Sequence, residues 1–282
     1  MEMILNDKIN KPIAVILPVY KNDKVDYIRM AFDSILNQTY KSIHLYVGVD
    51  GPVGNDITIC LKEYENESNV EISWFPENRG LAVVLNDLLD ICFTKGYEYI
   101  ARMDADDISL PNRIEKQYAF LKANPEIDVV GGAITEIDEN GNERGKTIIY
   151  PVGPVECYNF FAKRNPHAHP AVLFRKRFFE IARCKYRAEY RQNQDTMLWL
   201  DGMKAGTKHA NISDVVLKFR FTNALFRKRR NGWKFAKKQL VDRKIINKTL
   251  GYGIGATVFG YMMFIMLVSP AWIKKIAYKF FR

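Results

Sequence analysis

The chain has 282 residues, of which 48% are hydrophobic, enough for one large domain or for one domain with a smaller appendage. The formal net charge of +10 favours a polyanionic partner, either a nucleic acid or the anionic face of a membrane. The four cysteines are scattered without a Cys-x-x-Cys pair, which argues against a disulfide framework or a zinc site and favours reduced thiols in the cytosol. The segment Met1–Lys8 has no basic stretch followed by an apolar core, so we expect no signal peptide.

Short apolar runs alternate with helix-like segments over roughly the first hundred residues. The apolar runs cover residues 13–17, 44–49, 70–75 and 97–103. The helix-like segments between them cover residues 26–37, 56–64 and 81–93. Strands that alternate with helices of this length predict β-α-β units and a mainly parallel sheet. Because the runs are continuously apolar, we expect helices to cover both faces of this sheet.

Each apolar run ends in a segment with polar or turn-forming residues, and open α/β sheets bind ligands outside the carboxyl ends of their strands. These ends carry Pro18–Tyr20, Asp50–Gly51, Asn78–Gly80 and Asp104–Asp106. Asp50 can accept hydrogen bonds from a base or a ribose, and Arg79 can offset phosphate charge. Taken singly, Asp50 is explained as a turn residue and Arg79 as a surface charge. Their positions at successive strand ends favour one shared ligand site.

Three carboxylates, those of Asp104, Asp106 and Asp107, follow the fourth apolar run within four residues. Like charges this close repel one another, and a divalent metal with hard oxygen ligands is the simplest group to hold them together. Such a metal can grip the diphosphate of a nucleotide and stabilise it as a leaving group. The alternative is that Asp107 or Ser109 caps a helix that starts near Pro111.

The region after Asp107 is less regular. We expect helices over residues 111–123, 155–162 and 195–203, with Asp195 opening the last of them. We expect strands over residues 129–134, 146–150 and 171–174, with Asn140-Gly141 as a hairpin turn.

Six segments occur in the order found in the family 2 inverting glycosyltransferases, which the chain resembles over residues 12–220. They are Val15–Tyr20, Ser34–Tyr40, Asn78–Leu81, Met103–Asp107, Pro111–Gln117 and His169–Val172. The chain is most similar to the bacterial branch that builds O-antigen and capsule repeat units. The resemblance implies the α/β nucleotide-sugar-binding fold called GT-A, a nucleotide-sugar donor and a Mn or Mg ion.

The resemblance also assigns roles to residues. It implies that Asp104 lies near the ribose, that Asp106 ligates the metal, and that Pro18, Tyr20 and Asp50 lie around the nucleoside.

The catalytic base of the family usually belongs to a Glu-Asp pair before an aromatic-rich helix. Here the pair is Gln194-Asp195, which makes Asp195 the candidate base although the glutamate is absent. The Asp-Asp-Gly-Ser that is common after the second strand is here Val49–Pro52, so one acidic contact is missing. The Gln-x-x-Arg-Trp of processive synthases is absent, which favours the addition of one sugar per acceptor.

The C-terminal part combines basic and apolar sequence. Residues 218–248 contain twelve Lys or Arg residues and a single acidic residue, Asp242. The uncharged stretch Leu250–Ile273 follows, and then a tail that mixes basic and aromatic residues. This order predicts membrane contact rather than DNA binding. The segment Leu250–Ser269 is just long enough to span a bilayer, but its glycines and Pro270 favour in-plane or re-entrant attachment, and packing in a soluble protein is the third alternative.

We therefore divide the chain into a GT-A catalytic domain, residues 1–221, and a membrane-associating region, residues 222–282. The hypothesis is a non-processive inverting glycosyltransferase at the cytoplasmic face of the inner membrane. It would transfer one sugar, most simply from a UDP-sugar, to a polyprenyl-diphosphate-linked glycan. The alternatives are a GDP- or dTDP-sugar donor, or a catalytically silent membrane-binding protein. Nucleic-acid binding is disfavoured because the basic block runs directly into apolar sequence.

Overall fold

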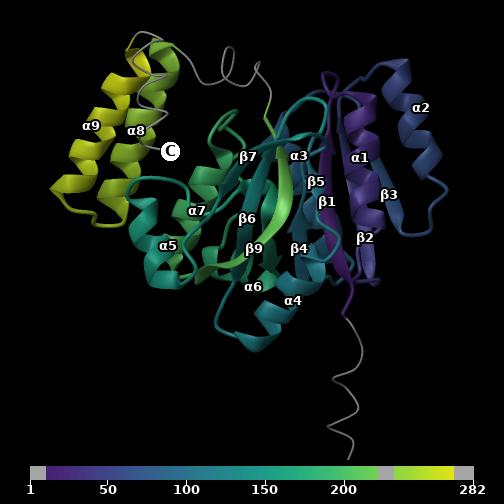
Figure 1. Cartoon of the computed structure of the whole chain (residues 1–282), viewed down its shortest axis with the longest axis horizontal. Helices are drawn as coiled ribbons and strands as arrows, with labels where there is room; N and C mark the ends of the chain where they lie inside the picture. Colours follow the sequence, from purple (N-terminus) through teal and green to yellow (C-terminus); the bar gives the residue numbers. More distant parts are fainter. Residues whose placement is uncertain (1–10, 222–231, 270–282) are drawn as a thin grey trace, which may run out of the picture.

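The computed structural model describes residues 11–221 and 232–269. Within these residues the strands form one nine-stranded sheet in the order β3-β2-β1-β4-β8-β6-β9-β5, and β7 pairs with β6 off this path. Helices lie on both faces of the sheet, and α8 and α9 form a hairpin at the end of the molecule away from α1 and α2 (Figure 1).

The first half of the chain has the expected β-α-β organisation. Strands β1 (Ile13–Val19), β2 (Ile43–Asp50), β3 (Val70–Phe75) and β4 (Tyr99–Arg102) pair in parallel. The connecting helices are α1 (Val25–Leu36), α2 (Asn55–Tyr64) and α3 (Leu81–Thr94). Strands β2 and β3 extend the sheet on one side of β1, whereas β4 lies on its other side. The boundary between β1 and β4 is therefore a topological switch point, the usual ligand position in an open α/β sheet.

The second half of the chain is mixed in direction; the hairpin predicted at Asn140-Gly141 is confirmed by the antiparallel pairing of β6 with β7, but the directions of the other strands were not predicted. Its strands are β5 (Ile108–Ser109), β6 (Val129–Ile137), β7 (Glu143–Ile148), β8 (Leu173–Arg175) and β9 (His209–Arg220). Its helices before the C-terminal hairpin are α4 (Arg113–Ala123), α5 (Pro154–Phe161), α6 (Lys176–Ala182) and α7 (Gln194–Ala205), with a 3-10 turn, η2, at His169–Ala171. Strand β8 runs antiparallel to β4 and β6, while the long β9 runs parallel to β6. The longer pairings are parallel, so the sheet is mainly parallel with short antiparallel additions.

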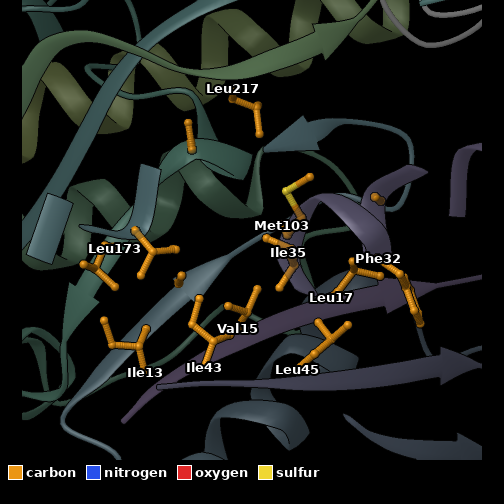
Figure 2. Packing of buried hydrophobic residues seen from close by; sticks show 14 of the residues in the cluster. Ile13, Val15, Leu17, Phe32, Ile35, Ile43, Leu45, Met103, Leu173 and Leu217 are labelled. Atoms are coloured by element: carbon orange, nitrogen blue, oxygen red, sulfur yellow. The ribbon is translucent and has the colours of Figure 1, made fainter. Parts of the chain in front are cut away.

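Two apolar layers explain the continuous hydrophobicity of the central strands. Ile13, Val15 and Leu17 of β1 pack in one cluster with α1, α2 and α4. Ala14 and Ile16 point to the opposite face and pack in a second cluster with α3, α6 and α7. Successive side chains of a strand alternate between faces, so a strand that is covered on both faces needs apolar residues at every position. Figure 2 shows the first cluster.

The C-terminal hairpin consists of α8 (Trp233–Thr249) and α9 (Ile254–Val268), which lie beside α5 and α7 (Figure 1). The apolar stretch that begins at Leu250 is thus not one continuous helix, because the chain turns between residues 250 and 253, with Gly251 at φ +69°. Across the described ranges, no helix combines the length and the apolar character that a membrane crossing needs. Residues 270–282, with the predicted basic and aromatic tail, and residues 222–231 lie outside the described residues.

Candidate active site

The three carboxylates that follow β4 converge at the switch point. Ligand oxygens of Asp104, Asp106 and Asp107 all lie within 4.8 Å of one another. Strand β4 pairs with β1, so the cluster comes next to the end of β1, where Pro18 and Tyr20 lie. Three hard oxygen donors this close together are suited to a divalent cation.

Arg102 is a buried cation beside this cluster. Its side chain is only 1% exposed, and its Nη2 atom lies 2.5 Å from Asp104 Oδ1. Its Nε and Nη1 atoms have no hydrogen-bond partner among the described residues. The guanidinium charge therefore acts on the carboxylates and not on a second fixed acceptor. Arg102 lies in the apolar run that forms β4, so its role has no signal in the sequence.

The pKa values of Asp106 and Asp107 are raised first by burial and then by repulsion between the carboxylates. Burial, and then the charge of Asp104, raises the pKa of Asp106 to about 6. Burial, and then the charges of Asp106 and Asp104, raises the pKa of Asp107 well above its ordinary value. A bound cation would relieve both effects, because opposite charge favours the ionised carboxylates.

Asp107 also ties the cluster to β9. Its Oδ1 atom accepts the backbone N–H of Arg220 at 2.8 Å, whereas its buried Oδ2 atom has no partner within the described residues. The helix-capping alternative is wrong, because the residue at the N-cap of α4 is Asn112 and Ser109 belongs to β5. The unpartnered oxygen and the donor chemistry of the cluster fit a divalent metal.

Asp50 holds the loop that follows β3. Its carboxylate accepts the backbone N–H groups of Arg79 at 2.7 Å and Gly80 at 3.0 Å, and the side-chain N–H of Asn78 at 3.0 Å. The ends of β2 and β3 are thereby fixed relative to each other. Contact of Asp50 with a nucleoside remains a prediction.

Arg79 is turned toward α3. Its guanidinium forms an ion pair with Asp87, and its Cζ atom lies 4.8 Å from the centre of the Phe75 ring. The expected contact of Arg79 with phosphate also remains a prediction.

Arg191 is a second basic residue whose position near the site has no signal in the sequence. A Cβ atom at Gly80, the residue before α3, would collide with the Arg191 guanidinium, and Gly80 has φ +92°. Glycine at this position allows both the left-handed backbone and the close approach. The contact joins the loop after β3 to the segment that leads into α7.

Asp195 lies in the first turn of α7, as expected. Its Oδ2 atom accepts a hydrogen bond from Asn165 Nδ2 at 3.0 Å, and Thr196 Oγ1 donates to Asn165 Oδ1 at 3.1 Å. Asn165 thus orients the carboxylate of the candidate base. The sequence offered no signal for this contact, since Asn165 lies in an irregular segment.

Tyr186 is a buried residue whose pKa responds to both the candidate base and the acidic cluster. Its hydroxyl lies 2.7 Å from Nε2 of His169. Burial raises the pKa of Tyr186; Arg102 opposes this effect, while Asp195 and Asp104 add to it. The charges of Asp104 and Asp195 therefore act on the same hydroxyl, although these residues are far apart in the sequence.

His167 and His169, which are separated by one residue, contact different partners. His167 contacts His209 and Asn211, whereas His169 contacts Tyr186. In the part of the chain that the structure describes, the candidate metal group consists of aspartates alone. We therefore assign no metal to the histidines.

Known proteins resemble this chain in sequence and in fold. Residues 14–189 match the family model described as "Glycosyl transferase family 2". The amylovoran biosynthesis glycosyltransferase AmsE of Erwinia amylovora is 31% identical over 248 residues, which cover 87% of this chain and 90% of AmsE. An Escherichia coli protein named UDP-Gal:alpha-D-GlcNAc-diphosphoundecaprenol beta-1,3-galactosyltransferase is 29% identical over 225 residues, covering 79% of this chain and 78% of that protein. The structure of S. aureus TarS 1-349 in complex with UDP-GlcNAc has a TM-score of 0.63 at 15% identity, covering 95% of this chain and 73% of that one, and shows a shared GT-A-like fold.

Proposed function

Because the chain belongs to glycosyl transferase family 2, we propose that it transfers a single sugar from a UDP-sugar to a hydroxyl of a polyprenyl-diphosphate-linked saccharide. The observation that carries this proposal is the cluster of the Asp104, Asp106 and Asp107 carboxylates at the switch point of the sheet. The name of the E. coli relative supports a UDP-sugar donor and a lipid-diphosphate acceptor. The name of AmsE supports a place in the assembly of a surface polysaccharide.

The proposed reaction is a single displacement with inversion. The acceptor oxygen attacks the anomeric carbon, the bond from that carbon to the diphosphate oxygen breaks, and the hydroxyl proton passes to Asp195. General-base catalysis of this kind contributes about 10²–10⁴-fold to the rate. Because the displacement inverts the anomeric carbon, an α-linked donor gives a β-linked product.

The negative charge of the leaving nucleoside diphosphate has to be offset on the other side of the sugar. A Mn or Mg ion held by Asp106, with Asp104 and Asp107 beside it, would supply this charge when bound. Arg102 keeps the Asp104 carboxylate in place through its ion pair. Pro18, Tyr20 and Asp50 stand around the proposed nucleoside position at the adjoining strand ends.

The C-terminal hairpin supports docking at the cytoplasmic face of the inner membrane, where the lipid-linked acceptor would be held. One helix, α9, exposes large apolar side chains: Ile254, Val258, Tyr261, Met262, Ile265 and Val268. The neighbouring α8 exposes Lys234, Lys237, Lys244 and Lys248. Apolar side chains beside lysines are suited to an anionic membrane surface. We propose that residues 222–282 attach the catalytic domain, residues 1–221, to that surface.

The test is a donor screen with detergent-purified full-length protein and a polyprenyl-diphosphate saccharide. UDP-, GDP- and dTDP-sugars are offered with Mn or Mg, and release of the nucleoside diphosphate is measured. The proposal expects metal-dependent turnover of a UDP-sugar. Turnover of a GDP- or dTDP-sugar alone would correct the donor. No turnover of any donor by folded protein would favour a catalytically silent membrane-binding protein.

A further inference from the structure

We infer that α8 positions the candidate catalytic base by clamping the side-chain amide of Asn193. The inference rests on the proposed function, because that function gives Asp195 its role. It makes Asn193, Gln239 and Asp242 positioning residues, and it gives the C-terminal hairpin a task beyond membrane attachment.

The first observation is the backbone at Asn193. This residue has φ +62° and ψ +23°, a left-handed conformation that few residues other than glycine adopt, with asparagine among the most tolerant. It immediately precedes α7, and its carbonyl accepts the N–H of Met197 at 3.1 Å. That hydrogen bond closes the first helical turn around Asp195. The conformation of Asn193 therefore sets the direction in which this turn presents the Asp195 carboxylate.

The second observation is that both ends of the Asn193 amide are held by α8. Asn193 Nδ2 donates to Asp242 Oδ2 at 2.7 Å, and Gln239 Nε2 donates to Asn193 Oδ1 at 2.9 Å. Gln239 and Asp242 are three residues apart, so they lie on one face of the helix. Asp242 is only 3% exposed, and a hydrogen bond to a buried carboxylate is stronger than one between neutral groups.

Asp242 is also the single acidic residue in the basic segment 218–248. Besides the amide of Asn193, it faces Lys238, whose Nζ atom lies 3.4 Å from Asp242 Oδ2. The buried carboxylate of Asp242 therefore lies where α8 packs against the segment before α7. There it accepts the hydrogen bond from Asn193.

The third observation is that other contacts anchor the hairpin. Tyr158 of α5 donates its hydroxyl to the Leu250 carbonyl at 2.5 Å, and Tyr252 donates to the carbonyl of Tyr158. Arg243 donates to the carbonyl of Phe161, also in α5. None of these bonds involves the segment before α7. The clamp on Asn193 can therefore be broken while the hairpin stays docked.

Residues 222–282 would have two roles, membrane attachment and positioning of Asp195, and a truncation would remove both at once. If residues 222–282 only attached the enzyme to a membrane, their contribution would disappear with a water-soluble acceptor. If α8 also positions Asp195, changes at Gln239 or Asn193 lower transfer to a short-chain, water-soluble diphosphate-linked acceptor as well. Donor binding is unaffected, because the clamp does not touch the acidic cluster.

The variants follow from the donor and acceptor pattern. Gln239→Glu puts a carboxylate opposite the side-chain oxygen of Asn193, Oδ1, and removes the N–H group that donates to this oxygen. Adding Asp242→Asn restores a matched set of contacts once the amide of Asn193 flips. In the double variant Q239E/D242N, Asn193 Nδ2 then donates to the carboxylate introduced at position 239, and Asn193 Oδ1 accepts from the amide introduced at position 242. Asn193→Gly removes both hydrogen bonds but still permits the left-handed backbone. Tyr252→Phe is the matched control, because it removes one hairpin anchor and leaves the clamp intact.

The experiment measures kcat, the KM for a short-chain soluble acceptor, and the dissociation constant of UDP, all with full-length protein. Small displacements of a catalytic group lower rates by about 10–10²-fold, so we expect Q239E and N193G to lose about 10-fold or more in kcat. UDP binding should stay within about 2-fold, Q239E/D242N should recover to within about 3-fold of wild type, and Y252F should match wild type.

Wild-type kcat in both Q239E and N193G, or failure of D242N to rescue Q239E, would overturn the inference. An equal loss in Y252F would assign the effect to hairpin docking and would overturn it as well. Hydrogen exchange at the Met197 amide keeps the two failures apart. Suppose that the Met197 amide exchanges faster in Q239E, that D242N reverses this change, and that wild type turns over no donor. The proposed function would then be wrong, while the clamp would still be shown to order the first turn of α7.

Discussion

A chain of buried neutral side chains beside the site gives a sharp pH prediction. His167 Nδ1 lies 2.9 Å from Asn211 Oδ1, and His167 Nε2 lies 3.0 Å from Nδ1 of His209. His209 Nε2 lies 3.0 Å from the Thr207 hydroxyl, and Asn211 Nδ2 donates to the carbonyls of Pro151 and Pro166. Because Asn211 Nδ2 donates to two carbonyls, its Oδ1 must accept from His167, which fixes the direction of the whole hydrogen-bond series. Thr207 donates to His209, His209 donates to His167, and His167 donates to Asn211, with both imidazoles neutral. A proton added to His167 Nε2 would face the N–H of His209.

The magnitude follows from the pKa of His167, which burial lowers from 6.5 to about 4. Below pH 6.5 the unfolded chain binds a proton at this residue and the folded chain does not, so the free energy of unfolding falls as the pH falls. The loss is about 1.4 kcal/mol per pH unit, and it reaches about 2 kcal/mol at pH 5. Above pH 6.5 the contribution is constant, and it levels off again below the folded pKa.

The assay is urea unfolding of wild type and His167→Gln at about pH 7 and about pH 5. Because the acidic cluster titrates in both proteins, its effect cancels in the difference. We expect the destabilisation caused by His167→Gln to be smaller at pH 5 than at pH 7 by about 2 kcal/mol. Tyr158→Phe, which changes no group that titrates in this range, should show the same destabilisation at both values. A pH-independent effect of His167→Gln would refute the assignment of a buried neutral imidazole.

Three further predictions concern the proposed reaction and the membrane surface. Asp106→Ala should lower kcat/KM for the donor by about 100-fold or more. EDTA should abolish turnover by wild type, and added Mn or Mg should restore turnover in wild type but should not raise the activity of Asp106→Ala. Asp195→Asn should lower kcat by about 10²–10⁴-fold with the donor KM within about 2-fold, and a loss confined to donor KM would argue against a base. Met262→Asp/Ile265→Asp should reduce co-sedimentation with phosphatidylglycerol vesicles by about 10-fold, whereas unchanged binding would remove α9 from the membrane contact.

The parts of the fold that the sequence predicted are those with a strong local pattern. Strand β1 and the acidic cluster illustrate this, because an apolar run of five residues and a set of three carboxylates are visible in short windows. The alternation of such runs with helical segments was sufficient to place Pro18, Asp50 and Asp104 at one edge of the sheet.

The parts that the sequence did not predict depend on contacts between distant residues. The strand predicted at residues 171–174 corresponds to β8, but its antiparallel direction is set by its neighbours β4 and β6 and has no local signal. Arg102 looked like one polar residue in a strand, and only the fold shows that its charge is buried against Asp104. The bonds of Asn193 to Gln239 and Asp242 cross more than forty positions and leave no local pattern.

The C-terminal stretch shows where a correct pattern had an ambiguous meaning. The absence of charge after Leu250 is compatible with a long helix, but Gly251 adopts a left-handed conformation and the chain turns before α9 begins at Ile254. Glycine lowers the cost of such a turn, which hydrophobicity alone does not register.

The most direct test of the central claim is the product formed from an α-linked UDP-sugar and a polyprenyl-diphosphate saccharide. Mass spectrometry counts the sugars added, and proton NMR gives the anomeric configuration. The account predicts one added sugar in β linkage, formed by wild type and not by Asp195→Asn. An α-linked product, a run of several sugars, or full activity of the Asp195→Asn variant would contradict it.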